Sequence, residues 1–247
     1  ATHETALKQT ALLLQQGHIV AVKGLGGFHL ACDANNQKAV NLLRQRKHRP
    51  TKPLAIMVPD LQFLQDLSAQ ETELLTSSAA PIVLLAKHKV PHIADNIAPN
   101  LQEIGVMLPS NPLQHLLLRA VNRPLVMTSA NASGQPPVLK NEYAVEQLAG
   151  LADFYLCHNR DILQRADDSL VRVAFDGLET LRRARGYVPD EIPLETQSAK
   201  NVLALGSDLK NTFCLLRHNK AVLSQHIGDT ANEQVRSQLS ENLELFQ

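Results

Sequence analysis

The sequence predicts an α/β fold: a twisted mixed sheet with helices on its faces over residues 1–190, followed by a partial second α/β unit. Short apolar runs rich in β-branched residues alternate with segments of helical period, which is typical of strands and helices in turn. Glycine, proline and asparagine separate these segments. Asp176 and Gly177 stand between two apolar runs and predict a two-residue hairpin turn.

The first unit is expected to contain both strands and capped helices. The expected strands are residues 19–22, 28–32, 54–58, 82–86, 104–108, 125–127, 154–157, 169–173 and 179–182. The expected helices are residues 5–16, 37–47, 61–67, 70–77, 113–120 and 143–148. Asn36, Asn111 and Asn141 stand at the starts of three helices and are expected to cap them, because an asparagine oxygen accepts from the unpaired N–H groups there.

The last part of the chain predicts a second, smaller unit. Residues 191–201 are mostly polar and are expected to be a linker. Residues 202–247 then contain three strand patterns, at 202–205, 212–217 and 221–225, and a helical pattern at 233–246. This is too little chain to enclose a site. The chain begins in mid-register and ends inside a helical pattern, so we expect a piece of a longer protein.

Composition excludes several classes of protein. The 24 basic and 24 acidic residues balance, and aromatic residues make up only 4% with no Trp, which disfavours a protein that coats nucleic acid. Cys32, Cys157 and Cys214 are far apart and form no C-x-x-C pair, so no disulfide framework or thiolate zinc site is predicted. No apolar run approaches the roughly 20 residues of a membrane span. We expect a cytoplasmic protein without a membrane anchor.

The densest group of basic side chains lies between a helix and a strand. Five of the nine residues from Arg44 to Lys52 are basic, and no acid occurs from Ala34 through Pro59. Pro50 and the apolar run 54–58 follow, so the charges are expected at the mouth of a buried strand, where fixed cations suit a polyanion such as a nucleoside triphosphate. The alternative is a solvated helix end, because cations are also favourable near a helix C-terminus.

Two segments of small residues follow strands and offer ligand contacts. Residues 23–27, Lys-Gly-Leu-Gly-Gly, let the backbone approach a ligand closely or make a simple turn, and the absence of a G-x-G-x-x-G pattern favours the turn. Ser129 and Asn131 leave the strand at 125–127, where ligands gather in open α/β sheets. An ordinary Asx or Ser turn is the alternative for this second segment.

A third segment is rich in arginine, and the histidines carry no metal signature. Residues 160–185 contain six arginines and no lysine, and arginine grips phosphate or carboxylate in a planar, bidentate way. Asp167 and Asp168 lie among them. His88 and His92 have the spacing of a helical metal pair, but Pro91 breaks the helix that would align them, so we expect loop residues. No histidine is expected to bind a metal.

Five motifs in order resemble one family. They are GLGGFHLACDA (24–34), RKHRPTKPLAIM (46–57), TSANASGQPP (128–137), HNRDILQRADDS (158–169) and RRARGYVP (182–189). Together they resemble the HypF family, the carbamoyltransferases of [NiFe]-hydrogenase maturation, through the YrdC-like domain of that family over about the first 190 residues. Residues 205–229 resemble the opening hairpin of its Kae1-like domain. The resemblance implies a YrdC-like sheet, with the second unit as the N-terminal part of a Kae1-like domain.

The resemblance also implies roles for individual residues. YrdC-like proteins hold ATP with a K-x-R and a later S-x-N, which are Lys47 and Arg49, and Ser129 and Asn131, in this chain. Arg165, Ser169, Arg183 and Arg185, with Lys52, are expected to bind the nucleotide as well. Lys23, Gly26 and Gly27 are expected to bind the carbamoyl substrate. Asp167 and Asp168 are expected to contact Mg²⁺, although neighbouring residues of an extended segment point to opposite faces.

The implied reaction is the ATP-dependent formation of carbamoyl-adenylate from carbamoyl phosphate. In the family the carbamoyl group then passes to the C-terminal cysteine of the partner HypE through the Kae1-like domain. Threonine-using synthases carry a different segment where this chain has Lys23 to Phe28, which favours the smaller carbamoyl group. Two alternatives remain open: a threonylcarbamoyl-AMP synthase, and a module that binds double-stranded RNA with the same basic concavity. Neutral net charge disfavours the RNA alternative.

Overall fold

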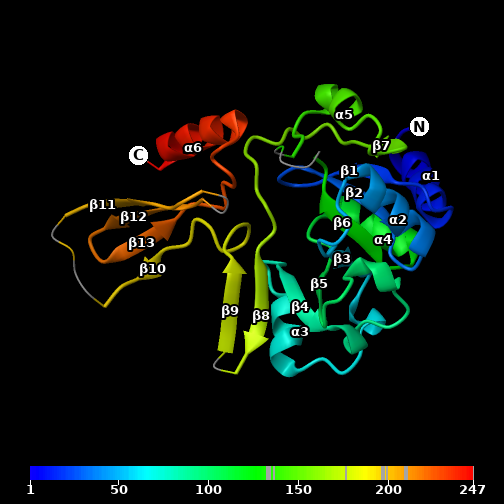
Figure 1. Ribbon diagram of the computed structural model, residues 1–247, viewed down its shortest axis with the longest axis horizontal. Helices are drawn as coiled ribbons and strands as arrows, with labels where there is room; N and C mark the ends of the chain where they lie inside the picture. The colour runs from blue at the N-terminus through cyan, green and yellow to red at the C-terminus, as the bar shows by residue number, and fades with distance from the viewer. Residues whose placement is uncertain are drawn as a thin grey trace.

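The computed structural model describes residues 1–131, 135, 137–175, 177–195, 198, 200–208 and 211–246. A larger α/β unit comes first in the chain, and a smaller unit follows it (Figure 1). The hairpin made by β8 (Leu170–Ala174) and β9 (Gly177–Arg182) lies on the side of the larger unit that faces the smaller one (Figure 1). The predicted hairpin is therefore confirmed, but Gly177, expected in its turn, is the first residue of β9 and pairs with Ala174, and Asp176 lies outside the described residues.

The larger unit is built on a mixed sheet, as predicted. In the described part of the chain nine strands pair in the order β7-β1-β2-β6-β3-β5-β4-β8-β9. Besides β8 and β9 these are β1 (Val20–Lys23), β2 (Phe28–Asp33), β3 (Ile56–Met57), β4 (Ile82–Ala86), β5 (Glu103–Met107), β6 (Leu125–Ser129) and β7 (Phe154–Leu156). β1 pairs with β2 in antiparallel and with β7 in parallel orientation. In the expected strand at 54–58 every residue except the half-buried Ala55 is buried, but the ends of the segment bond to Ile97 and Met107 outside the strand pairing of β3.

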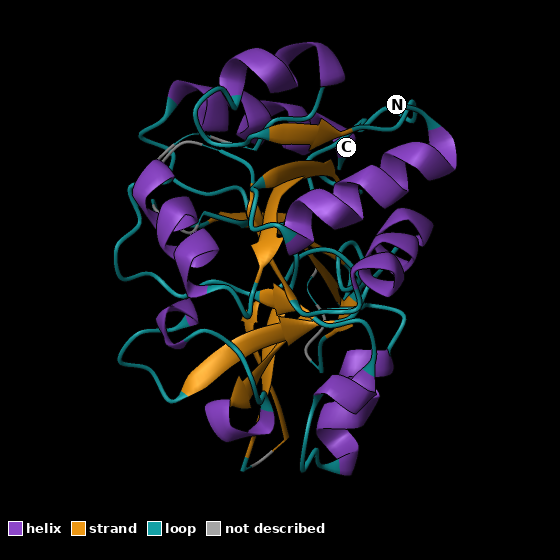
Figure 2. Ribbon diagram, turned by 90° about the vertical axis from the view of Figure 1, so that its right-hand side faces the viewer, coloured by secondary structure: helices purple, strands orange, loops and turns teal. Residues whose placement is uncertain are grey.

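Helices cover both faces of this sheet (Figure 2). They are α1 (His3–Gln15), α2 (Gln37–Arg46), α3 (Ala69–Thr76), α4 (Pro112–Val121) and α5 (Asn141–Gln147), with short 3-10 turns η1 (Leu61–Phe63), η2 (Lys87–Lys89) and η3 (Asp95–Ile97). Successive strand residues point to opposite faces. Thus Val20 and Val22 pack with Leu14 of α1, whereas Ala21 packs with the α2 side of the core.

The predicted caps are correct at two helices and wrong at a third. The side chain of Asn36 accepts from Lys38 N and Ala39 N, and that of Asn111 accepts from Gln114 N. Asn141 does not cap α5, because the helix begins at that residue and its amide instead donates to the His158 carbonyl. The helix expected at 61–67 is wrong beyond Phe63, because Leu64 is already extended.

The smaller unit is a sheet with one helix packed on it. Its described strands pair in the order β10-β13-β12-β11, and they are β10 (Ile192–Pro193), β11 (Val202–Leu205), β12 (Phe213–Arg217) and β13 (Lys220–Leu223). β10 lies in the range expected to be a linker and pairs with β13. Helix α6 (Glu233–Leu245) packs Val235 against Phe213 and Ile227. Among the described helices, none has the length and apolar character needed to cross a bilayer.

Candidate nucleotide site

A cavity of about 840 Å³ brings together segments that are far apart in the sequence. Its wall includes the β1–β2 turn, the basic loop after α2, the end of β6 and the segment that precedes β8. Nine of the predicted site residues line it: Gly26, Gly27, Arg49, Lys52, Ser129, Asn131, Arg165, Asp167 and Asp168. The remaining predicted residues, Lys23, Lys47, Ser169, Arg183 and Arg185, do not belong to its wall.

Arg49 and Lys52 present unneutralised charge to the cavity. Arg49 donates from Nη2 to the Pro53 carbonyl at 2.9 Å, and its Nε has no hydrogen-bond partner among the described residues. Burial lowers the pKa of Arg49, and the nearby charges of Arg44 and Arg182 lower it further. Among the described residues Arg49 has no carboxylate partner, and a cation held among other cations favours a bound anion, so this part of the cavity suits phosphate.

Lys47 does not line the cavity; it lies behind the wall and bonds to the S-x-N turn. Its side chain is 5% exposed, and Nζ donates to the Ser129 carbonyl at 2.6 Å, to the Asn131 carbonyl at 3.0 Å and to Asn131 Oδ1 at 3.3 Å. Burial, assisted by the charge of Arg49, lowers the pKa of Lys47 to about 8. Lys47, the first residue of the K-x-R motif, therefore holds the S-x-N turn. The sequence gives no means of predicting this contact.

The S-x-N turn has its own internal bonds. Ser129 Oγ donates to Asn131 Oδ1 at 2.7 Å, and Asn131 Nδ2 donates to the Gln135 carbonyl. Residues 132–134, which complete the small polar stretch, lie outside the described residues. Ser129 and Asn131 both line the cavity, so the turn directs polar atoms to the same space as Arg49.

Glycine at position 26 allows two loops to approach each other. A Cβ at Gly26 would stand 2.2 Å from the Ala166 carbonyl oxygen, and Ala166 N donates to the Gly26 carbonyl at 3.2 Å. Gly24 N donates to the Gly27 carbonyl at 2.8 Å, which closes the turn that the sequence favours over a phosphate loop. Lys23 is 2% exposed and donates to the His158 carbonyl, so it stands beneath this turn and away from the cavity.

Both aspartates of the segment before β8 are held by arginines. Asp167 pairs with Arg165 at 2.8 Å. Asp168 Oδ1 pairs with Arg185 at 2.8 Å, and its Oδ2 lies 3.4 Å from His29 Nε2. Burial raises the pKa of Asp168, but the His29 contact and the Arg185 ion pair outweigh it and hold the pKa below its ordinary range. Both carboxylates line the cavity even though they are adjacent in sequence.

Ser169, Arg183 and Arg185 support the fold around the cavity. Ser169 is fully buried, donates to the Arg185 carbonyl at 2.9 Å and accepts from Ala184 N at 2.8 Å. Arg185 also donates to the carbonyls of Ala79 and Ala80. Arg183 donates to the Asp190 carbonyl and lies over the Tyr187 ring. Ser169 and Arg185 therefore hold the segment before β8 against the turn that precedes β4.

The residues present fit a magnesium ion only in part. Among the described residues no three His, Cys, Asp or Glu side chains gather as a metal site. Asp167 and Asp168 face the cavity, but each already neutralises an arginine. Mg²⁺ often uses one or two carboxylates together with substrate phosphates, so the aspartates could complete such a site but do not form one by themselves.

Sequence reasoning missed five charged or titratable residues of the wall: His29, Glu103, Arg172, Arg182 and His226. One signal was present for His29. It is the second residue of a predicted strand, and in the structure it pairs directly with Ser129 across β2 and β6. Directly paired residues place their side chains on the same face. The pairing of β2 with β6 could not be read from the sequence.

The smaller unit contributes to the wall as well. His226 lines the cavity, and Arg165 Nη1 donates to the Ile227 carbonyl at 3.2 Å and to Gln238 Oε1 at 3.1 Å. Gln164 Nε2 donates to Asn242 Oδ1 at 2.7 Å. Helix α6 thus holds the loop that carries Arg165. Residues 202–247, which the sequence predicts to be too short to enclose a site, help to enclose the cavity of the larger unit.

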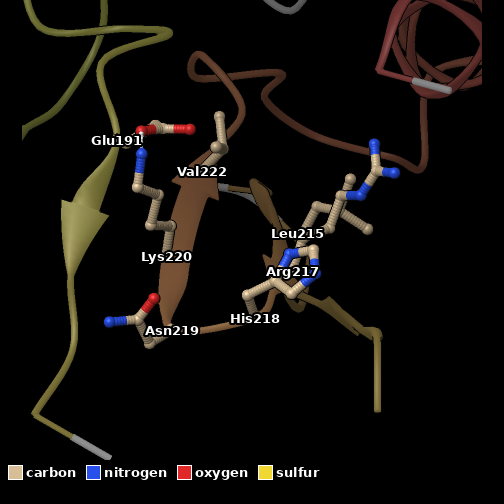
Figure 3. Close-up of a pocket in the computed structure, with 7 residues that line it drawn as sticks. All are labelled: Glu191, Leu215, Arg217, His218, Asn219, Lys220 and Val222. Atoms are coloured by element: carbon tan, nitrogen blue, oxygen red, sulfur yellow. Dashed lines mark hydrogen bonds and ion pairs between the residues drawn. The ribbon is translucent and has the colours of Figure 1, made fainter. Parts of the chain in front are cut away.

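A separate pocket of about 480 Å³ lies on the smaller unit (Figure 3). It is lined by Glu191, Leu215, Arg217, His218, Asn219, Lys220 and Val222. Lys220 and Glu191 form an ion pair across its edge, and both are about half exposed. The pocket shares no lining residue with the large cavity and contains none of the predicted site residues.

Comparison with known proteins identifies both units. A family model described as "Telomere recombination", for the Sua5, YciO and YrdC proteins, matches residues 12–184, and a model of the HypF Kae1-like domain matches residues 197–247. The chain is 48% identical to carbamoyltransferase HypF2 of Cupriavidus necator. The match covers 92% of this chain but only 30% of the length of that relative. It is also 32% identical to the threonylcarbamoyl-AMP synthase of Xylella fastidiosa, over 60% of this chain and 84% of the synthase.

Solved structures agree with the sequence matches. The crystal structure of full-length HypF in its phosphate- and nucleotide-bound form superposes with a TM-score of 0.91 and 42% identity, over 98% of this chain and 39% of that one. These matches confirm the predicted YrdC-like fold and the predicted resemblance to the HypF family. The chain therefore belongs to the Sua5, YciO and YrdC family, in the form that HypF proteins carry, with a HypF Kae1-like segment after it.

Proposed function

We propose that this chain catalyses the ATP-dependent formation of carbamoyl-adenylate from carbamoyl phosphate. In the longer protein that the HypF relatives represent, the carbamoyl group would then pass to the C-terminal cysteine of a HypE-like partner. The names of the relatives, carbamoyltransferases, support the transfer class. The nucleotide in the related HypF structure supports a nucleotide as the activating substrate.

One observation carries the proposal: the K-x-R loop and the S-x-N turn meet at a single cavity and are bonded to each other through Lys47. The cavity is lined by cationic side chains such as Arg49 and Lys52 and by apolar residues that include Leu54, Leu84 and Met127. A triphosphate with a planar base matches such a division of polar and apolar lining. A cavity of about 840 Å³ also suits a small ligand better than a long RNA backbone.

The reaction needs positioning and charge neutralisation more than covalent work by the protein. Carbamoyl phosphate first reacts with water and gives carbamate and inorganic phosphate. A carbamate oxygen then attacks the α-phosphorus of ATP, a new P–O bond forms, and the bond from the α-phosphorus to the bridging oxygen breaks to release pyrophosphate. Arg49 and Lys52 would hold the phosphate oxygens where negative charge moves toward the leaving group. Ser129 and Asn131 would orient the nucleotide. Bound Mg²⁺ would neutralise phosphate charge, with Asp167 or Asp168 as its protein ligand.

Calorimetric titration with ATP tests the nucleotide site. Arg49→Ala removes a charge-assisted contact, and Lys47→Ala removes the anchor of the S-x-N turn, so each should weaken ATP binding by about 1.5 to 3 kcal/mol. His48→Ala is the matched control, because His48 lies between them and is exposed. Equal affinity in all four proteins would refute the assignment of K-x-R to the nucleotide.

A second candidate is threonylcarbamoyl-AMP synthesis, which the match to the Xylella fastidiosa synthase favours. Pyrophosphate exchange into ATP distinguishes the two. We expect exchange that depends on carbamoyl phosphate, and no exchange when threonine and bicarbonate replace it. The opposite pattern would assign the chain to the synthases.

A further inference from the structure

Arg44 is a buried arginine that bonds only to backbone carbonyls among the described residues. It lies in the last turn of α2 and is 6% exposed. Its Nε donates to the Asn96 carbonyl at 2.8 Å and its Nη2 to the Ile97 carbonyl at 3.1 Å. Its Nη1 donates to the carbonyls of Arg49, Pro50 and Lys52 at 2.8, 3.2 and 2.9 Å. Arg44 therefore does not serve as the helix-end cation that its position in sequence suggests.

These five carbonyls belong to two different parts of the molecule. Asn96 and Ile97 belong to η3, and Ile97 is fully buried in the core beneath α2. Arg49, Pro50 and Lys52 form the basic loop, and the side chains of Arg49 and Lys52 line the cavity. The guanidinium thus ties the backbone of the loop to the rigid core.

Apart from the Arg44 side chain, the loop is held by backbone bonds from Arg49 N to the Arg44 carbonyl and from Leu54 N to the Ile97 carbonyl. It forms no regular secondary structure, and Pro50 and Pro53 have no N–H to donate. Buried carbonyls need donors, and a planar guanidinium with five N–H groups can supply several of them at once. Repulsion among Lys47, Arg49 and Lys52 would otherwise spread the loop, because no acid is available within this stretch of sequence.

We propose that Arg44 is the positioning residue of the phosphate-binding loop: it holds the backbone of residues 49–52 so that Arg49 and Lys52 both point into the cavity. The inference rests on the proposed binding of ATP. Arg44 itself does not line the cavity, so it acts through Arg49 and Lys52. A lysine cannot replace it, because an ammonium carries three donors on one atom and cannot reach both η3 and the loop.

Arg44→Lys tests this while keeping the charge. We expect ATP affinity to fall on the order of tenfold, the scale of one coupled contact, while adenosine affinity stays unchanged. A merely structural role would lower both affinities together. Arg46→Gln is the matched control, because Arg46 lies two residues away and bonds instead to Asp153 and the Leu151 carbonyl. This control should leave both affinities as in the parent chain.

The double variant Arg44→Lys with Arg49→Ala makes the test specific. If Arg44 acts by placing Arg49, the two losses are not additive, and Arg49→Ala has a smaller effect in the Arg44→Lys background. Additive losses, or an unchanged ATP affinity in Arg44→Lys, would overturn the inference. Absence of ATP binding by the parent chain would instead refute the proposed function.

A measurement on the unmutated chain covers the case in which Arg44→Lys does not fold. The proton on Arg44 Nε should exchange slowly with solvent. Its ¹H–¹⁵N resonance should shift when ATP binds but not when adenosine binds. Rapid exchange of this proton, or a resonance that ATP does not shift, would contradict the positioning role of Arg44.

Discussion

We expect the ionisation of Lys47 to affect the proposed nucleotide site, because its ammonium holds the S-x-N turn. Its pKa of about 8 in the folded chain lies below the ordinary value of 10.5, because burial disfavours the charged form. Below pH 8 folded and unfolded chains both carry this charge, and the full penalty of burying it is present. Between about pH 8 and pH 10.5 the folded chain has lost the proton and the unfolded chain has not, so this group adds stability as the pH rises.

ATP affinity should change with pH in the opposite direction. The charged form of Lys47 donates three hydrogen bonds to the S-x-N turn and adds positive charge behind the cavity wall, so we expect ATP binding to take up a proton once the free site has lost it. We expect the dissociation constant for ATP to rise about tenfold between about pH 7 and about pH 9. Calorimetry across this range measures the effect. Lys47→Arg, which keeps its charge, should show a flatter profile, and equal profiles in the two proteins would contradict the prediction.

Asp168 should matter more for folding than its place in the cavity wall suggests. Asp168→Asn leaves Arg185 without its counterion in a largely buried position, which should lower the free energy of unfolding by about 3 kcal/mol. Urea denaturation measures this loss. The control is Glu179→Gln, because its pair with Arg172 is about 40% exposed and should contribute under about 1 kcal/mol. A loss no larger than in the control would show that the Asp168 pair is dispensable.

At the scale of elements, the turn between β1 and β2 is limited by its contact with the segment before β8. Gly26→Ala would place a methyl group against the Ala166 backbone, which has no flexible end to move aside. We expect the loops to separate, with lower thermal stability and ATP affinity reduced on the order of tenfold or more. Thermal unfolding and calorimetry measure the two effects.

Gly27→Ala provides the comparison within the same turn. A Cβ there would first meet the Pro137 side chain at 3.1 Å, a milder contact than the backbone of Ala166. Gly27→Ala should therefore lower thermal stability and ATP affinity less than Gly26→Ala does. Equal effects would mean that the approach of the two loops does not determine the site.

At the scale of the whole molecule, the Kae1-like segment holds part of the nucleotide site in place. Gln238 of α6 accepts from Arg165, which lines the cavity of the larger unit. Gln238→Ala should therefore weaken ATP binding by about 0.5 to 1.5 kcal/mol, although the residue lies outside the YrdC-like domain. Calorimetry compares it with Glu241→Ala, an exposed position on the same helix. Unchanged affinity in Gln238→Ala would show that α6 does not position Arg165.

Much of the local structure was determined by the sequence itself. The strand at Ile82–Ala86, the cap of α2 by Asn36 and the hairpin of β8 and β9 follow from periodicity, capping and turn chemistry. These interactions join residues close in sequence, so a short window contains the information. The grouping of cations after α2 and of small polar residues after β6 was visible for the same reason, and it located the walls of the candidate site.

Only the tertiary structure decided which of these residues face the cavity. Lys47 turns to the S-x-N carbonyls 82 and 84 positions away, and Arg165 bonds to residues 62 and 73 positions away. Arg44 bonds to η3, more than 50 positions away in sequence, and does not line the cavity whose loop it supports. Motif spacing marks which side chains can carry charge. Burial and the supply of partner carbonyls decide which of those charges are left for a ligand, and both depend on how distant segments pack.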